Sequence, residues 1–448
     1  MKKNIAVWKR YAITFFSLWI ILLGFKIVSC YLPNERISNH MAISSDLILK
    51  EGRYPQNFIN LPVQGFDYLY ASVRIDTVQD YSVLSTVFLN NSQNAVKNAL
   101  LNTGIYITEP ENIVRMFRGE PEETMDRPQY WMGLTAILRV LYYFFDMAAV
   151  RQFSLLVFTL VSVYLLICIA KEFGTSYAVA LAVSMVCVNV WILPFTPVLN
   201  ITYYLAVLFS IVILKLYGKN PVALWMFCFG IITAFFDWMS TPLLTYGLPM
   251  VMILLILMKK SSDLKLKNGI FLLFKNGIAW IAGYSMMIIS KWVIGTLLLG
   301  INVFEIGLKR ADAGMNVLVE GDAPTALGVA KQSLEYNFYA LYPFTSQPTK
   351  VKWGILLGIL LIMAVMLAIF HKKFSQCIPS VLLLFVGAIP YAWYIVLKGH
   401  CHIHFWFTYR SQMISIMALC CALIYALDIE KIRKLCSSLF HSESLNER

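Results

Sequence analysis

The sequence places ionisable side chains inside stretches that are otherwise apolar. Lys26, Asp237, Lys291 and Arg410 lie in long apolar stretches, and Arg139 lies in a shorter one. A charge in such a stretch is costly in a membrane and commonly marks a functional site, although Lys and Arg near a helix end also reach the lipid headgroups. In the topology argued below, all five side chains fall toward the outer side of the membrane. We therefore predict a shared site there.

Two acids form a second candidate set. Asp76 and Asp80 are four residues apart, so on a helix both carboxylates lie on one face and could point into one cleft. Asp76 also fits a helix N-cap, because Gln79 follows three residues later in a variant of the capping box. That structural alternative does not apply to Asp80.

Three of the six histidines lie close together, at His400, His402 and His404. In an extended segment these alternating side chains would share a face and could bind a metal. No carboxylate lies close in the sequence to complete the ligand set. Hydrogen bonding to sugar or phosphate, or a structural role at the interface, is therefore favoured, and the sequence predicts no metal and no other cofactor.

The composition indicates lipid as the solvent around most of the chain. Of 448 residues, 59% are hydrophobic and 14% are charged, whereas soluble proteins have roughly 25% charged residues. The net charge of +12 comes from Lys and Arg clusters between apolar stretches, a pattern typical of topology signals. We predict no nucleic-acid partner. The nine cysteines lie mostly in apolar stretches and are interpreted as core residues.

Ten stretches come near the length of about 20 apolar residues that crosses roughly 30 Å of hydrocarbon. They are residues 11–31, 152–171, 176–195, 198–216, 221–237, 241–258, 276–298, 353–370, 377–397 and 406–427. The first is predicted to be a retained signal anchor, because no small-residue cleavage site follows it. The sequence therefore predicts an all-α integral membrane protein.

The basic clusters decide whether the apolar segment Trp131–Val150, which contains Arg139 and Asp146, is an eleventh span. If it does not cross, the clusters all lie on the cytoplasmic side; if it crosses, the cluster at 259–275 faces outward, against the positive-inside rule. We therefore predict that this segment is a helix at the outer interface. The protein would be multi-pass in the cell membrane with both termini cytoplasmic.

This topology gives a single polytopic domain over residues 1–448. It has a long first extracytoplasmic loop at 32–151 that contains interfacial helices, and a second at 301–351. No repeat of fixed period is present, which weighs against a transporter built from inverted repeats.

Part of the first loop resembles the GT-C membrane glycosyltransferases, including the lipid A aminoarabinose transferases. The resemblance is carried by Arg127-Pro128-Gln129-Tyr130-Trp131, Phe144-Phe145-Asp146 and Ala149-Val150-Arg151. The layout is also similar, with one span, a long outer loop and then a bundle of spans.

Over nearly the whole chain, the sequence resembles uncharacterised GT-C-like membrane proteins of Gram-positive bacteria. The similar stretches are 235–243, 281–284 with 291–293, and 402–410. Two positions depart from the GT-C pattern: Gln129 replaces a proline, and Pro197-Val198-Leu199-Asn200 lacks the second acid that relatives often have there.

The resemblance implies a glycosyltransferase that moves a sugar from a polyprenyl-phosphate donor to a cell-envelope glycan or lipid outside the cytoplasmic membrane. Its partners would be the lipid-linked sugar donor and membrane lipids. The predicted catalytic acids are Asp80, Asp76 and Asp237. The predicted phosphate ligands are Arg127, which falls where the family has a phosphate-contacting base, with Lys291 and Arg410. The predicted sugar or acceptor ligands are Tyr130, Trp131, His402, His404 and Tyr409.

Two other functions stay open at this point. A transporter or flippase of lipid-linked sugars would also need cations for phosphate, but it would need polar residues across the whole bilayer, and the inner halves of these spans are apolar. A non-catalytic partner in envelope assembly is supported by the missing second acid.

Overall fold

The computed structural model describes residues 2–52, 72–260, 265–316, 325–345, 348–373, 377–432 and 434. Within this part the chain is almost entirely helical, and its one small sheet pairs β1 (Gly104–Ile105) with β2 (Thr124–Met125) in antiparallel register. The predicted all-α class is confirmed.

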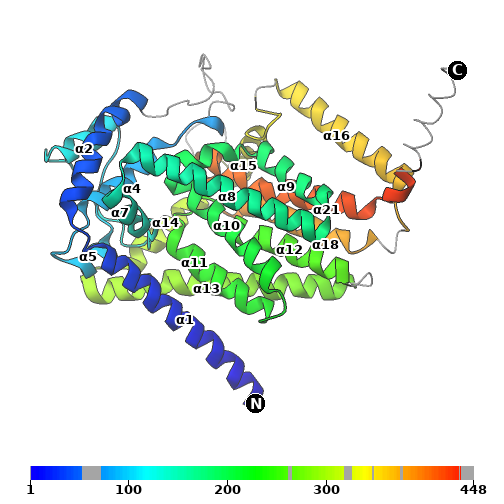
Figure 1. Ribbon diagram of the computed structural model, residues 1–448, viewed down its shortest axis with the longest axis horizontal. Coiled ribbons are helices and arrows are strands. Elements are labelled where there is room, and N and C mark those ends of the chain that lie inside the picture. Colours follow the sequence, from blue (N-terminus) through cyan, green and yellow to red (C-terminus); the bar gives the residue numbers. More distant parts are fainter. Residues whose placement is uncertain are drawn as a thin grey trace.

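Ten helices coincide with the apolar stretches of the sequence, and all ten are labelled in Figure 1. They are α1 (Lys2–Ser29), α8 (Met147–Phe173), α9 (Thr175–Cys187), α10 (Pro197–Leu216), α11 (Val222–Phe236), α12 (Leu244–Lys260), α13 (Leu266–Leu299), α16 (Thr349–Phe370), α18 (Ser380–Val396) and α21 (Met413–Ala426).

Six helices of the described part are long and apolar enough to cross a membrane: Ala6–Ser29, Met147–Phe173, Pro197–Leu216, Leu266–Leu299, Lys350–Phe370 and Phe405–Ala426. The chain is accordingly a multi-pass helical membrane protein. The other four predicted spans coincide with α9, α11, α12 and α18, which have 13, 15, 17 and 17 residues. These are shorter than the length of about 20 residues that spans a bilayer upright, so the number of ten stays a prediction.

The part of the chain predicted as the first outer loop forms short helices at one end of the bundle, on the left of Figure 1. They are α2 (Asn34–Glu51), α4 (Thr77–Leu89), α5 (Ala95–Leu101), α6 (Pro110–Phe117) and α7 (Leu134–Phe144). Helix α7 has 11 residues, hence a length of roughly 17 Å, about half of the hydrocarbon thickness. It is too short to cross.

The predicted interfacial helix Trp131–Val150 is corrected in its extent. The helix ends at Phe144 because Phe145 is extended, with φ −136° and ψ 150°. Asp146 then caps the next helix, α8, by accepting a hydrogen bond from the backbone N–H of Ala149 at 2.8 Å.

The remaining short elements lie between the later spans. They are η1 (Val190–Phe195), α14 (Val303–Asn316), α15 (Ala326–Tyr339), α19 (Lys398–Ile403), α20 (Phe405–Thr408) and η2 (Tyr409–Gln412). Helix α14 packs on α13 and on α19.

Glycines allow α11 and α13 to pack backbone against backbone. A Cβ added at Gly230 would lie 2.1 Å from the carbonyl oxygen of Trp280, and one at Gly283 would lie 2.1 Å from that of Phe227. Both distances are far inside van der Waals contact, so hydrogen is the only side chain that fits. This contact fixes the spacing of two helices that line the cavity described next.

Candidate functional site

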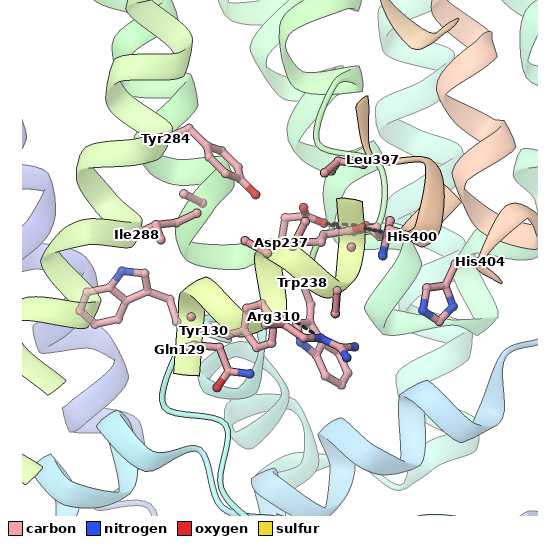
Figure 2. A pocket seen from close by; sticks show the side chains of 18 of the residues that line it. Gln129, Tyr130, Asp237, Trp238, Tyr284, Ile288, Arg310, Leu397, His400 and His404 are labelled. Carbon is pink, nitrogen blue, oxygen red and sulfur yellow. Dashed lines mark hydrogen bonds between the residues drawn. The ribbon is translucent and has the colours of Figure 1, made fainter. Parts of the chain in front are cut away.

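A cavity of about 310 Å³ lies at the end of the bundle that carries the loop helices (Figure 2). It is bounded by the last residues of α11 and α18, the first turn of α10, the C-terminal half of α13, and α14 and α19. Its polar lining residues are Gln79, Gln129, Tyr130, Asp237, Ser240, Tyr284, Arg310, His400 and His404. The rest of the wall is apolar and rich in aromatic rings.

Asp237 supplies a carboxylate to this cavity. The residue follows α11, is 4% exposed, and its Oδ1 accepts hydrogen bonds from the Thr202 hydroxyl at 2.9 Å and from Ser240 N–H and O–H at 2.9 and 2.6 Å. Its other oxygen, Oδ2, has no hydrogen-bond partner among the described residues. A buried carboxylate oxygen without a partner is costly, so a ligand group that donated a hydrogen bond to it would be favoured.

The histidine segment is helical instead of extended, so a different set of histidines shares a face. On a helix, residues four apart lie one above the other, and the rings of His400 and His404 are 4.9 Å apart at the cavity wall. His402 points elsewhere and stacks on Tyr336 at 4.9 Å. The extended arrangement considered for metal binding is therefore absent here. The described residues contain no group of three or more His, Cys, Asp or Glu that could hold a metal ion.

The two cavity histidines are neutral near pH 7. Burial, with a smaller contribution from nearby Arg310, lowers the pKa of His400 to about 4 and that of His404 to about 3. The Nε2 atom of His400 lies 3.0 Å from the carbonyl oxygen of Met239, so the proton is assigned to this nitrogen. The Nδ1 atom of His404 is buried and has no partner among the described residues.

Arg310 brings a cation to the cavity from α14. Its Nε donates a hydrogen bond of 3.3 Å to the hydroxyl of Tyr130, and the side chain is exposed at the cavity mouth. Figure 2 shows Arg310 beside Tyr130 and Trp238, on the same side of the cavity as Gln129. Sequence reasoning missed Arg310 because it lies in a polar segment between spans. The glycines at 307 and 314, which place it on the inward face of α14, were the available signal.

The aromatic wall is held by hydrogen bonds from its own ring nitrogens. Trp131 donates to the carbonyl oxygen of Met287 at 2.6 Å, and Trp292 donates to that of Gln129 at 3.1 Å. Tyr130 packs edge-on against Trp238 at 6.1 Å. Tyr130 and Trp131, both predicted ligands, are therefore firmly placed at the cavity.

The two predicted acids of the first loop are outside the cavity wall. Asp76 caps α4 by accepting from Gln79 N at 3.3 Å, and its second oxygen accepts from Trp406 Nε1 at 2.8 Å. Asp80 accepts from the N–H of Val198 at 3.1 Å and so caps the start of α10. Burial raises the pKa of Asp76 and raises that of Asp80 well above its usual value. Both oxygens of Asp76 are therefore hydrogen-bonded, whereas Oδ2 of Asp80 is buried and has no partner among the described residues.

Asp80 borders a second space that is too small for a substrate. That space is about 10 Å³ and is also lined by Tyr81, Tyr142 and Arg151, the last of which is ion-paired with Glu51. A volume of this size holds about one water molecule.

The three predicted phosphate ligands donate to protein oxygens and do not line the cavity. Arg127 donates to the Ser82 hydroxyl at 2.5 Å, and its guanidinium carbon lies 5.7 Å from the centre of the Trp238 ring; its Nη1 has no partner among the described residues. Lys291 donates to the carbonyl oxygen of Leu100 at 2.6 Å, at the C-terminus of α5. These contacts satisfy helix ends and loop carbonyls.

Tyr409 and Arg410, which follow the histidines, also donate their hydrogen bonds to protein oxygens. Arg410 donates to the carbonyl oxygens of Ser72 and Trp406, both at 2.9 Å. Tyr409 donates to the carbonyl oxygen of Val188 at 2.9 Å. Of the predicted site residues, the structure thus brings Tyr130, Trp131, Asp237 and His404 together in one cavity. The ligand roles given to the others stay predictions.

Comparison with known proteins gives no relative from which to transfer a function. No protein-family model, curated protein or solved structure matches the chain. The function is therefore argued from the cavity.

Proposed function

We propose that this protein is a membrane glycosyltransferase that moves a sugar from a polyprenyl-phosphate donor to a cell-envelope glycan or lipid on the outer face of the cytoplasmic membrane. The observation that carries the proposal is that Asp237, a buried acid with one unpartnered oxygen, lines the same cavity as the exposed side chain of Arg310. A base and a cation in one cavity are the two groups that this reaction needs.

The proposed step balances as follows. Asp237 takes the proton of an acceptor hydroxyl, the acceptor oxygen forms a bond to the anomeric carbon, and the bond from that carbon to the phosphate oxygen breaks. The electron pair leaves with the polyprenyl phosphate, and Arg310 stabilises the negative charge that develops there. A positioned base contributes roughly 10²–10⁴-fold to the rate, and a preorganised cation acts most strongly where water is excluded.

The cavity wall supports a sugar as the transferred group. Tyr130, Trp238 and Trp292 offer ring faces for the apolar faces of a pyranose, and the unpartnered Oε1 of Gln129 and Nδ1 of His404 offer acceptors for its hydroxyl groups. Because a buried acceptor without a partner is unfavourable, hydroxyl donors from a ligand would be bound selectively.

The distribution of lysines between the two ends of the bundle supports a location of the cavity on the outer side of the membrane. Lys259 and Lys260 end α12, and Lys265 precedes α13, at the end of these helices opposite the cavity. With that end cytoplasmic by the positive-inside rule, the cavity faces outward and both termini lie inside.

The test is sugar transfer by the full-length protein in nanodiscs, from a panel of radiolabelled polyprenyl-phosphate sugars to envelope acceptor fractions. Asp237→Asn should lower the rate about 10²–10⁴-fold. The fold should persist, since an asparagine Oδ1 can still accept from Thr202 and Ser240. Asp80→Asn is the matched control, a second buried acid outside the cavity, and should stay near the wild-type rate.

Two results would contradict the proposal. Asp237→Asn with wild-type turnover would exclude this carboxylate as the base. Movement of the labelled donors across vesicle membranes without any sugar transfer to an acceptor would support the transporter function instead.

A further inference from the structure

Helix α14 presents an inward stripe that leads from the bundle to the cavity. Val303, Gly307, Arg310 and Gly314 recur at spacings of four, three and four, so they lie on one face. Val303 is fully buried, and a Cβ at Gly307 would lie 2.4 Å from the ring of Trp292. Arg310 and Gly314 continue this face along the cavity wall.

A second stripe of α14 is apolar and exposed. Phe304, Leu308, Ala311 and Met315 have the same spacing, and Phe304, Leu308 and Met315 are 36%, 60% and 36% exposed. The adjoining stripe is polar, with Glu305, Lys309, Asp312 and Asn316. A helix that carries one exposed apolar stripe and one charged stripe is suited to the boundary between water and hydrocarbon.

The apolar stripe is continuous with the cavity. Ala311 and Met315 belong to the stripe and also line the cavity wall. Arg310, the residue before Ala311, carries its guanidinium at this junction. A molecule that extends along the stripe therefore reaches the cation and then the cavity that contains Asp237.

We propose that the apolar stripe of α14 binds the hydrocarbon tail of the phosphate lipid whose head group enters the cavity and binds Arg310. This assignment rests on the proposed function for the identity of the head group. The occupant is the tail of that ligand, because the stripe leads into the cavity, and an anionic head group complements Arg310. Because the stripe faces hydrocarbon, the tail adds affinity through packing contacts along it, while Arg310 binds the head group.

The test measures binding of two probes to the full chain in nanodiscs: farnesyl phosphate, which has a tail, and inorganic phosphate, which has none. Leu308→Ser should weaken farnesyl phosphate about tenfold and leave inorganic phosphate unchanged, because the variant loses packing contacts with the tail and leaves a hydroxyl without a partner beneath it. Arg310→Gln should weaken both probes. Lys309→Ser, the adjacent residue on the polar stripe, is the matched control and should change neither.

Three outcomes would overturn the proposal. The first is unchanged binding of farnesyl phosphate by Leu308→Ser with the thermal midpoint preserved. The second is unchanged binding of both probes by Arg310→Gln. The third is equal competition by a short-chain phosphatidic acid with the same dependence on Leu308, which would assign the stripe to ordinary bilayer lipid. The assay uses no sugar, so its result is independent of whether Asp237→Asn abolishes transfer.

Discussion

At the scale of single residues, buried charge in this protein has two different uses. Lys26, Arg139 and Lys291 are fully buried and donate hydrogen bonds mainly to backbone carbonyl oxygens. Arg139, for example, donates to those of Ser29, Val87 and Asn90 at 2.8, 2.5 and 2.5 Å. These oxygens lie at or just beyond the ends of α1 and α4, where intrahelical donors are lacking. Asp237 keeps one oxygen unsatisfied at a cavity. Asp80 also has one buried oxygen without a partner, so the feature that distinguishes Asp237 is its position in the wall of the 310 Å³ cavity.

The cavity histidines give a prediction for pH. Burial lowers the pKa of His400 to about 4 and of His404 to about 3, whereas both would titrate near about 6.5 in the unfolded chain. As the pH falls from 6.5 toward 4, the unfolded state takes up protons that the folded state does not. The free energy of unfolding therefore decreases over this range.

Thermal midpoints in detergent between pH 7 and 4.5 test this. The double variant His400→Gln/His404→Gln should lose less stability over this range than the wild type. His371→Gln, at an exposed histidine, is the control and should follow the wild type. Parallel curves for the double variant and the wild type would show that the two rings do not titrate in this way.

At the scale of elements, the contact between α11 and α13 sets one side of the cavity. Asp237 follows α11, and Tyr284, Ile288 and Trp292 project from α13. Figure 2 shows the hydroxyl of Tyr284 directed into the space beside Asp237. The separation of these side chains depends on the glycine contact between the helices.

Gly283→Ala should therefore destabilise the protein by about 1–3 kcal/mol, because the new methyl group overlaps the carbonyl oxygen of Phe227. Gly354→Ala in α16 is the matched control, since nothing lies within 4 Å of the added Cβ. There the higher helix propensity of alanine should leave stability unchanged or raise it by up to about 1 kcal/mol. Reversible unfolding in mixed detergent micelles measures both, and equal effects would refute tight packing at Gly283.

Hydropathy predicted the helices well, but it did not predict the protein oxygens to which the buried cations donate. The positions of the long spans depend on local composition, so α8, α10 and α13 lie close to their predicted residues. The partner of Lys291 is a carbonyl of α5 almost 200 residues earlier, and this contact depends on how the outer loop docks. Arg310 was missed because a cation in a polar segment is ordinarily solvated. The helical register of His400 and His404 was missed because six residues form too short a helix to have a clear period.

At the scale of the whole molecule, the proposed orientation can be tested by chemical labelling. In a cysteine-free background, Lys309→Cys in α14 should react with a membrane-impermeant maleimide in intact cells. Lys267→Cys, at the exposed start of α13, should react only after permeabilisation. Equal reactivity of the two variants in intact cells would reject the proposed topology, and the outward-facing cavity with it.

The buried ammonium groups also constrain the order in which the chain assembles in a bilayer. Lys26 in α1 contacts Asn102 and the carbonyl of Trp131, and Lys291 in α13 contacts Leu100, so both are covered only when the outer loop has docked. Before that, each would cost about 2.5–3.5 kcal/mol in the hydrocarbon. Both spans should therefore first sit with these groups at the headgroups and move inward once the loop closes over them. The final depth of these two spans in the membrane is then determined last, when the predicted outer loop docks on them.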